Sequence, residues 1–256
     1  MMTGFRRLRP WLAPVGAAAG LAVLVPPVGV AARQYVYVQA IQFAVLATAV
    51  PALVVLGAPW RRVGAPVASL AARLANARSH RRGAAPAWAA MIGFIAVAVI
   101  WRLPIAVNAL VRYPALTAVE ALSLLAAGCL LWVELVESPP FLPTIARPMR
   151  AAFSALPMWT IWAMAYIMAF SHTVWFTAFA PNAGHRPGVI VDQQIATFLL
   201  WAITGLCFVP VVFVSLLTWL RDTSDPDHEL RRVPSPSGAA APRAPRPPRG
   251  WRLPPA

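Results

Sequence analysis

Long apolar segments, separated by short polar ones, follow one another along most of the chain. A helix needs about 20 residues to cross a hydrocarbon core of about 30 Å, and these segments are long enough. None of them shows the short apolar–polar alternation of a membrane β-barrel strand. The pattern therefore predicts an all-α, polytopic membrane helix bundle with about six transmembrane helices. The predicted spans are 11–32, 35–58, 88–111, 114–135, 151–180 and 193–220.

The first apolar run follows a basic segment, so it could be either a signal peptide or a retained helix. Its length of about 22 residues exceeds the roughly 7–15 apolar residues of a signal peptide, which favours a retained span. Gly16 and Gly20 form a GxxxG pair that allows close helix packing. Pro26 and Pro27 predict a bend near the far end of this helix.

The polar segments divide the chain into three parts. Residues 1–10 are predicted to be a cytoplasmic N-terminus, residues 11–220 the transmembrane domain, and residues 221–256 a disordered cytoplasmic tail rich in Pro and Arg. Within the second part, residues 66–77 are predicted to form a short amphipathic helix on the membrane surface.

The charge distribution indicates the orientation of the bundle. The chain has 22 Lys and Arg against 8 Asp and Glu, all 22 basic residues being Arg, and it is 59% hydrophobic and 12% charged with a mean hydropathy of +0.65. With both termini in the cytoplasm, 18 of the 22 arginines fall on the cytoplasmic side, as the positive-inside rule requires. Because this charge lies between spans and in tails, no nucleic-acid partner is expected. We expect a multi-pass protein of a bacterial plasma membrane, surrounded by lipid.

A few polar side chains interrupt the apolar runs near the predicted outer surface. At 1.5 Å rise per residue they share a layer roughly 0–15 Å deep. Charges at this depth are rare and usually paired, so we expect Arg102 to pair with Glu120 or Asp192. Interhelical hydrogen bonds between amides are the simpler interpretation of the glutamines. The predicted polar cluster comprises Gln39, Gln42, Arg102, Glu120, Asp192 and Gln193.

Four segments between about residues 35 and 220 combine polar residues with Pro, Gly or Trp in distinctive patterns. The first runs from Gln39 to Phe43 and is followed by a Leu-Gly-Ala-Pro ending at Pro59. The second is Trp101-Arg102-Leu103-Pro104. The third runs from Thr117 to Ala121 around Glu120, and the fourth is Asp192-Gln193-Gln194 leading to Trp201. Together these segments resemble the CtaG-type cytochrome c oxidase assembly factors.

The resemblance implies a membrane bundle that takes part in copper insertion into haem–copper oxidases. At the positions where the family has histidines, this chain has Gln39, Phe43, Arg102, Thr117 and Ala121. Amide, guanidinium and methyl groups are poor copper ligands compared with imidazole, so we expect the fold to carry over and the copper site not to. If copper is a cofactor, the remaining ligand candidates on the outer side are His172, His185 and Asp192.

The resemblance implies a non-enzymatic role in cytochrome c oxidase assembly, with haem–copper oxidase subunits as partners. A metal-free membrane scaffold of another complex is the alternative. A small-solute or ion carrier is the third interpretation, and the absence of an inverted repeat in the sequence disfavours it. No nucleophile–base motif is visible, so an enzyme is not expected.

Overall fold

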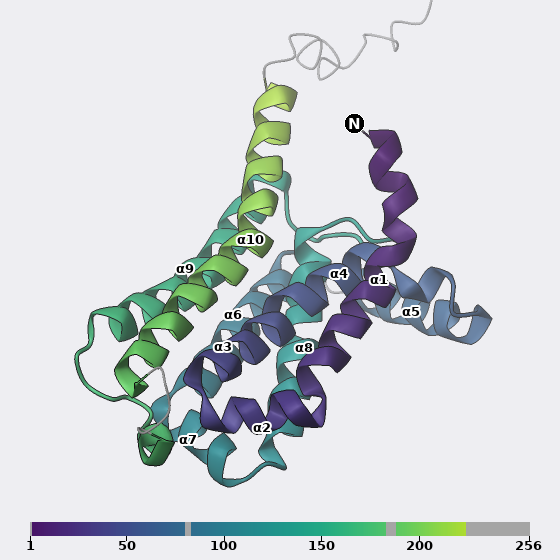
Figure 1. Cartoon of the computed structure of the whole chain (residues 1–256). Helices are drawn as coiled ribbons and strands as arrows, with labels where there is room; N and C mark the ends of the chain where they lie inside the picture. Colours follow the sequence, from purple (N-terminus) through teal and green to yellow (C-terminus); the bar gives the residue numbers. More distant parts are fainter. Residues whose placement is uncertain (1, 80–82, 183–187, 224–256) are drawn as a thin grey trace, which may run out of the picture. The chain divides into compact units, whose positions relative to one another are not determined.

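The computed structural model describes residues 2–79, 83–182 and 188–223, and these residues are predominantly helical (Figure 1). No β-strand occurs among them, although Ser138 and Phe141 form an isolated bridge. The chain divides into two compact units, Met1–Thr218 and Trp219–Ala256, and the description below concerns the first. The predicted all-α membrane bundle is confirmed.

The longest connections between α-helices are residues 136–146 and 171–188. Among the described residues, five helical segments are long and apolar enough to cross a membrane, and a pair bent by 56°, α1 and α2, makes a sixth if it is counted as one span. The α-helices are α1 Met2–Leu24, α2 Pro26–Gln34, α3 Val36–Ala44, α4 Val50–Gly57, α5 Ala65–Ser79, α6 Ala85–Arg102, α7 Pro104–Arg112, α8 Leu116–Leu135, α9 Arg147–Phe170 and α10 Val189–Thr223. The shorter elements are the π-helix η1 Val45–Ala49 and the 3₁₀ helices η2 Pro59–Arg61 and η3 Thr177–Asn182.

Prolines divide two of the predicted spans. Pro26 begins α2 and Pro104 begins α7, and the residue before each, Val25 and Leu103, has an extended backbone. This is the conformation that a following proline imposes, and it interrupts the helical hydrogen bonds. The predicted span 88–111 is therefore two helices, with Arg102 at the break.

The predicted span 151–180 is shorter than expected, because α9 ends at Phe170. The Ser171 hydroxyl contacts the Thr173 hydroxyl at 2.8 Å and accepts a hydrogen bond from Trp175 Nε1 at 2.6 Å. Local side-chain hydrogen bonds of this kind compete with helix continuation. The chain then turns and reaches η3.

The segment from α3 to α4 is the most buried of the candidate spans. Pro51 has no N–H for the carbonyl of Ala47, and the helix widens there into η1, where Val50 N–H bonds Val45 O instead. The segment packs against α1 on one side and α8 on the other. Gly16 of α1 lies so close to α4 that an added Cβ would meet Leu53 Cβ at 2.9 Å, which is the close packing predicted from the GxxxG pair.

Gly128 sets the closest approach of α8 to α4. An added Cβ would lie 2.5 Å from Pro51 Cγ and 2.7 Å from Ala47 O, whereas one at Gly93 of α6 would meet nothing within 4 Å. We expect Gly128→Ala to destabilise the bundle by about 1–3 kcal/mol through overpacking. The matched change Gly93→Ala should be neutral or stabilise by up to about 1 kcal/mol through helix propensity. Thermal unfolding of both variants in detergent measures the difference, and equal midpoints would contradict this account of the contact.

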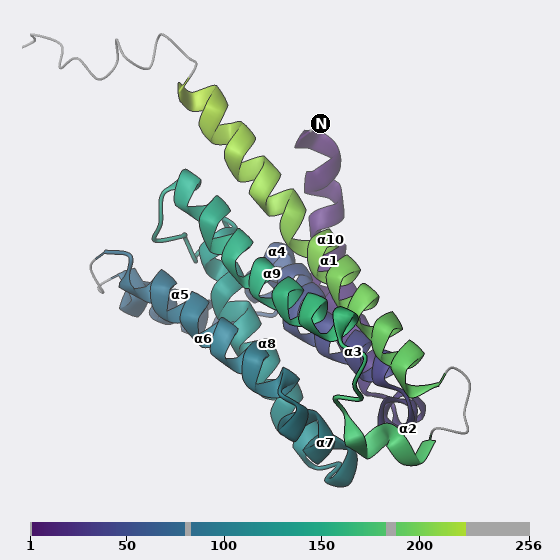
Figure 2. The ribbon, with the colours of Figure 1, turned by 90° about the vertical axis from the view of Figure 1, so that its left-hand side faces the viewer.

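The connections gather at two ends of the bundle, called here the α5 end and the α2–α7 end (Figures 1 and 2). At the α5 end, Arg78 Nη2 of α5 lies 2.6 Å from Glu134 Oε1 of α8. Trp60 Nε1 donates to Pro139 O at 2.9 Å in the same region. At the other end, α2, α7 and η3 contact one another. Two of the segments predicted to be cytoplasmic, 59–79 and 136–146, thus lie together at the α5 end, whereas most of the predicted tail 221–256 falls outside the described residues. The orientation itself stays a prediction.

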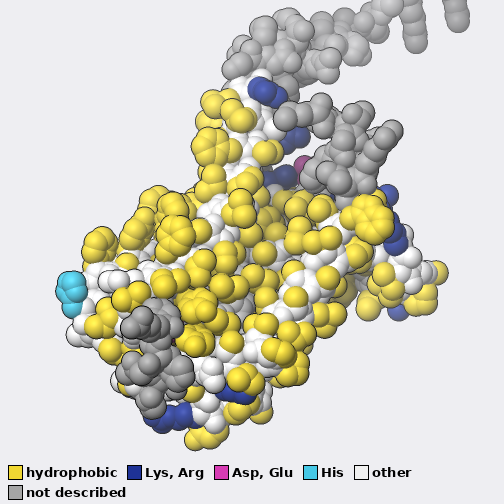
Figure 3. All heavy atoms as spheres, in the orientation of Figure 1, with side chains coloured by type: hydrophobic (Ala, Val, Ile, Leu, Met, Phe, Trp, Pro, Cys, Tyr) yellow, Lys and Arg dark blue, Asp and Glu magenta, His cyan; other side chains and the backbone are white. Residues whose placement is uncertain are grey.

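Large apolar side chains point outward along the helices. Figure 3 shows hydrophobic side chains covering most of the visible helical surface, with arginines gathered near its ends. Ile105, Phe170 and Leu206 are 78–79% exposed although they lie on three different helices. Such a surface would aggregate in water and is suited to lipid.

Candidate functional site

Arg102, at the end of α6, is a buried cation with only 3% of its surface exposed. Its Nη1 donates to Gln39 Oε1 at 2.6 Å, and its Nη2 lies 3.9 Å from Met168 Sδ. The guanidinium carbon is 5.4 Å from the ring centroids of both Phe43 and Phe176, within cation–π range. One cation therefore contacts α3, α9 and the turn before η3 from its position at the end of α6.

Gln39 connects this cation to an acid. Its Nε2 donates to Glu120 Oε1 at 3.3 Å, and Glu120 of α8 is 1% exposed. Among the ion pairs of the described residues, none joins Arg102 directly to Glu120. The partnership expected from the sequence is therefore indirect: one amide accepts from the cation and donates to the carboxylate.

Asp192 has a different partner from the one expected. Its Oδ2 accepts from Val36 N–H at 2.8 Å and its Oδ1 from Tyr37 N–H at 2.9 Å. These are the first amides of α3, whose N-cap residue Tyr35 makes no side-chain capping bond. A carboxylate at this position also interacts favourably with the helix dipole. Asp192 thus caps α3 from the first turn of α10 and is not among the hydrogen-bond partners of Arg102.

The other two predicted amides satisfy backbone groups. Gln193 Oε1 accepts from Trp175 N–H at 3.1 Å, and its Nε2 donates to Met168 O at 3.3 Å, so it supports the turn after α9. Gln42 Nε2 donates to Val23 O at 2.9 Å. That carbonyl would bond the N–H four residues on in a regular helix, but Pro27 has none. Both glutamines therefore supply hydrogen-bond partners to backbone groups that are left free where a helix ends or breaks. In an apolar surrounding such groups need a partner within the protein.

A cavity of about 270 Å³ opens beside this cluster at the α2–α7 end. Its wall contains Glu120 together with Thr117 and residues of α2, α3 and α7. The polar groups lining it come from Arg33, Gln39, Gln42, Thr117 and Glu120. The remaining lining is apolar or Gly, so a ligand in this cavity would meet a carboxylate, a guanidinium, a hydroxyl and two amides among apolar groups.

The histidines predicted as metal ligands lie elsewhere or outside the described residues. His172 is exposed in the turn after α9, and His185 falls in the part of the chain that the structure does not describe. Within the described ranges, no group of three His, Cys, Asp or Glu side chains could hold a metal ion.

Two of the positions at which the resemblance places histidines contact Arg102, which is itself such a position. Gln39 and Phe43 contact its guanidinium, whereas Thr117 lines the cavity beside Gln39 and Glu120, and Ala121 is buried. Copper sites in proteins are built from imidazole and sulfur donors, and a fixed guanidinium repels a metal cation. The soft sulfur of Met168 faces that guanidinium. The residues present do not fit a copper ion at this position.

Two groups of the cluster carried no recognisable signal in the sequence. Met168 and Phe176 contact Arg102, yet each lies in a segment where similar apolar residues are frequent. A cation within an apolar segment favours contacts with aromatic rings or sulfur atoms of other segments. Which ring or sulfur it contacts depends on how the helices pack. The ion pair between buried Glu134 of α8 and Arg78 of α5 was likewise not predicted.

The fold and the buried cluster define an integral membrane helix bundle with a polar site near one end. Residues 3–222 match the family described as cytochrome c oxidase caa3 assembly factor (Caa3_CtaG). The chain belongs to this family, which confirms the resemblance seen in the sequence. No curated protein and no solved structure matches the chain.

Proposed function

We propose that this protein acts, without catalysis and without a copper ion of its own, in the assembly of a cytochrome c oxidase. Membership of the assembly-factor family supports the role in assembly. The observation that carries the metal-free part is the buried Arg102, fixed by Gln39 and two aromatic rings among the positions where the resemblance places histidines. A permanent cation there takes the place that a metal cation would need.

The cavity beside the cluster is the surface through which the protein contacts the oxidase. Its volume of about 270 Å³ is below the usual range of about 300–1,000 Å³ for small-molecule pockets. It suits one or two side chains of a membrane partner. Glu120 and Thr117 offer hydrogen-bond acceptors to such side chains, and Arg33 offers donors. Haem–copper oxidase subunits are the partners in this proposal.

Deletion of the gene tests the role in assembly. We expect loss of assembled oxidase, measured as haem absorbance of membranes and oxidase activity, with rescue by the wild-type chain. Thr117→Val should rescue less well, because it removes a hydroxyl from the cavity wall at nearly constant volume, whereas Gly93→Ala on α6 should rescue fully. Unaltered oxidase after deletion would overturn the proposal, and loss of another membrane complex would favour the scaffold alternative.

Copper analysis of the purified full-length protein tests the metal-free part separately. After incubation with Cu(I) and removal of excess metal, we expect far less than one copper per chain, with no change in His172→Ala or His185→Ala. A stoichiometric copper content that either substitution abolishes would show that the protein handles copper. That result would leave the role in assembly standing.

A further inference from the structure

A second cavity, of about 400 Å³, lies at the α5 end, where α10 faces the ends of α4 and α8 and the start of α9. Along α10 the lining changes from apolar to hydroxyl-bearing side chains. Pro210, Val211 and Val214 contribute apolar surface, and Ser215 and Thr218 follow one turn further on. These five residues lie on one helix face and span about 12 Å at 1.5 Å per residue. We call this cavity the α10 groove.

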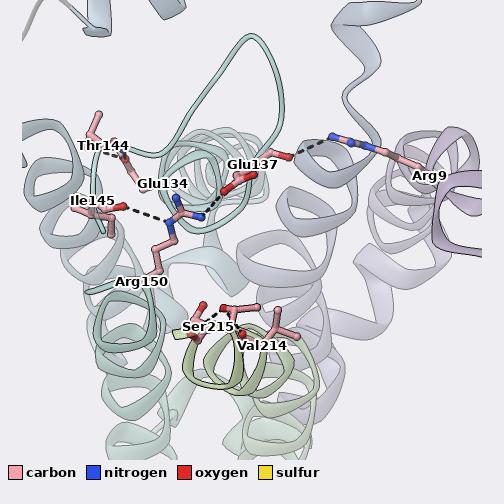
Figure 4. Close-up of polar contacts among 9 residues, drawn as sticks. Arg9, Glu134, Glu137, Thr144, Ile145, Arg150, Val214 and Ser215 are labelled. Atoms are coloured by element: carbon pink, nitrogen blue, oxygen red, sulfur yellow. Dashed lines mark hydrogen bonds and ion pairs between the residues drawn. The ribbon is translucent and has the colours of Figure 1, made fainter. Parts of the chain in front are cut away.

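The polar part of the α10 groove is basic. Arg147 and Arg150 of the first turn of α9 line it, and Glu137 is the acid in its wall. Arg9 lies alongside: its Nε donates to Leu56 O at 2.9 Å and its Nη2 to Glu137 O at 3.3 Å. Figure 4 shows Arg9 and Arg150 on either side of Glu137, above Val214 and Ser215. The groove and its edge thus hold three arginines and one glutamate, and Arg150 contacts the glutamate's carboxylate.

Glu137 neutralises only part of this charge. Its Oε1 lies 3.1 Å from Arg150 Nη1, but its side chain is 57% exposed, so the pair is weak. Arg150 Nε also donates to Ile145 O at 3.3 Å. A guanidinium has five N–H donors, more than these two contacts use, and it binds phosphate oxygens in a bidentate manner. The rim therefore retains capacity for an anion.

We propose that the α10 groove binds one anionic phospholipid. Its phosphate contacts Arg147 and Arg150, and an acyl chain lies along Pro210, Val211 and Val214. The order of the groove, basic then hydroxyl then apolar, is the order of headgroup, ester region and chain in a phospholipid. The arginine distribution predicts that this end lies on the cytoplasmic side of the membrane. The cytoplasmic leaflet contains anionic lipids. The proposal is independent of the proposed role in oxidase assembly.

Lipid binding to the purified full-length protein in detergent tests this directly. We expect added phosphatidylglycerol to stay bound in native mass spectrometry and to raise the thermal unfolding midpoint. Phosphatidylcholine with the same acyl chains and inorganic phosphate should do neither. Arg147→Gln should weaken phosphatidylglycerol binding about fivefold, from about one kcal/mol per Arg near an anionic headgroup. Arg61→Gln, an equal charge change at an exposed residue of the same end, should leave it unchanged.

Three further variants separate lipid binding from structural roles. Arg150→Gln and Glu137→Gln break the same ion pair, yet the first should weaken and the second strengthen phosphatidylglycerol binding. Val214→Trp should weaken it by filling the apolar part of the groove without changing charge. Three results would each overturn the proposal: phosphatidylcholine binding as well as phosphatidylglycerol, Arg61→Gln weakening phosphatidylglycerol binding as much as Arg147→Gln, or Glu137→Gln weakening it. Stabilisation by inorganic phosphate alone would indicate a phosphate site and overturn it as well.

Discussion

Replacing Arg102 by leucine is expected to destabilise the bundle by about 3–5 kcal/mol, the cost of removing one partner from a buried charge network. Glu120, 1% exposed, would then lose the cation to which Gln39 links it, and Gln39 would lose the donor to its oxygen at 2.6 Å. The rings of Phe43 and Phe176 would also lose their cation. Thermal or denaturant unfolding in detergent measures the loss, and Arg112→Leu, at an exposed residue of α7, is the matched control.

A double-mutant cycle tests the indirect coupling. Arg102→Leu combined with Glu120→Leu should cost less than the sum of the single changes, by about 0.5–3 kcal/mol, because neither buried charge is then left without the other. In a Gln39→Leu background this coupling should fall, since the amide joins the two groups. Additive losses with Gln39 present would contradict the network. A coupling that Gln39→Leu leaves unchanged would mean that the two charges interact without the amide.

The sequence predicted the layer of polar residues but not their partners. Arg102 and Glu120 stand out because each is a charge inside an apolar run, and helical rise alone places them at similar depth. Their partners depend on which helix faces lie side by side, and a single sequence holds little information on that. The bridging amide of Gln39 could not be distinguished from Gln42, three residues away, which bonds a carbonyl freed by Pro27.

The bend near Pro26 was predicted from the sequence, whereas the π-helix before Pro51 and the early end of α9 were not. Pro26 and Pro104 begin new helices as their chemistry requires. The π-helix accommodates the missing N–H of Pro51, and the early end of α9 at Phe170 goes with the local hydroxyl contacts of Ser171. Asp192 illustrates the same limit: an acid at the start of a helix predicts a cap for its own helix, yet it caps α3.

Asp192→Ala is expected to destabilise the bundle by about 2–4 kcal/mol, because two amides that now bond a carboxylate would be left without it. Val36 N–H is buried and Tyr37 N–H partly so, and Tyr35 supplies no replacement cap. Asp192→Asn keeps one acceptor oxygen and should cost about half as much. Unfolding in detergent gives the total loss, and hydrogen exchange at Val36 and Tyr37 shows whether it is local to the start of α3.

The neighbouring exposed residue provides the control for this contact between α10 and α3. Gln194→Ala, two positions along the same helix, should change neither unfolding nor exchange at Val36, because its side chain faces outward. Combined with Arg102→Leu, Asp192→Ala should be nearly additive, since its carboxylate bonds backbone amides and not the guanidinium. Strong coupling between Arg102 and Asp192 would instead favour the direct pairing expected from the sequence. Equal costs of the Ala and Asn variants would argue that the second hydrogen bond contributes little to holding α10 against α3.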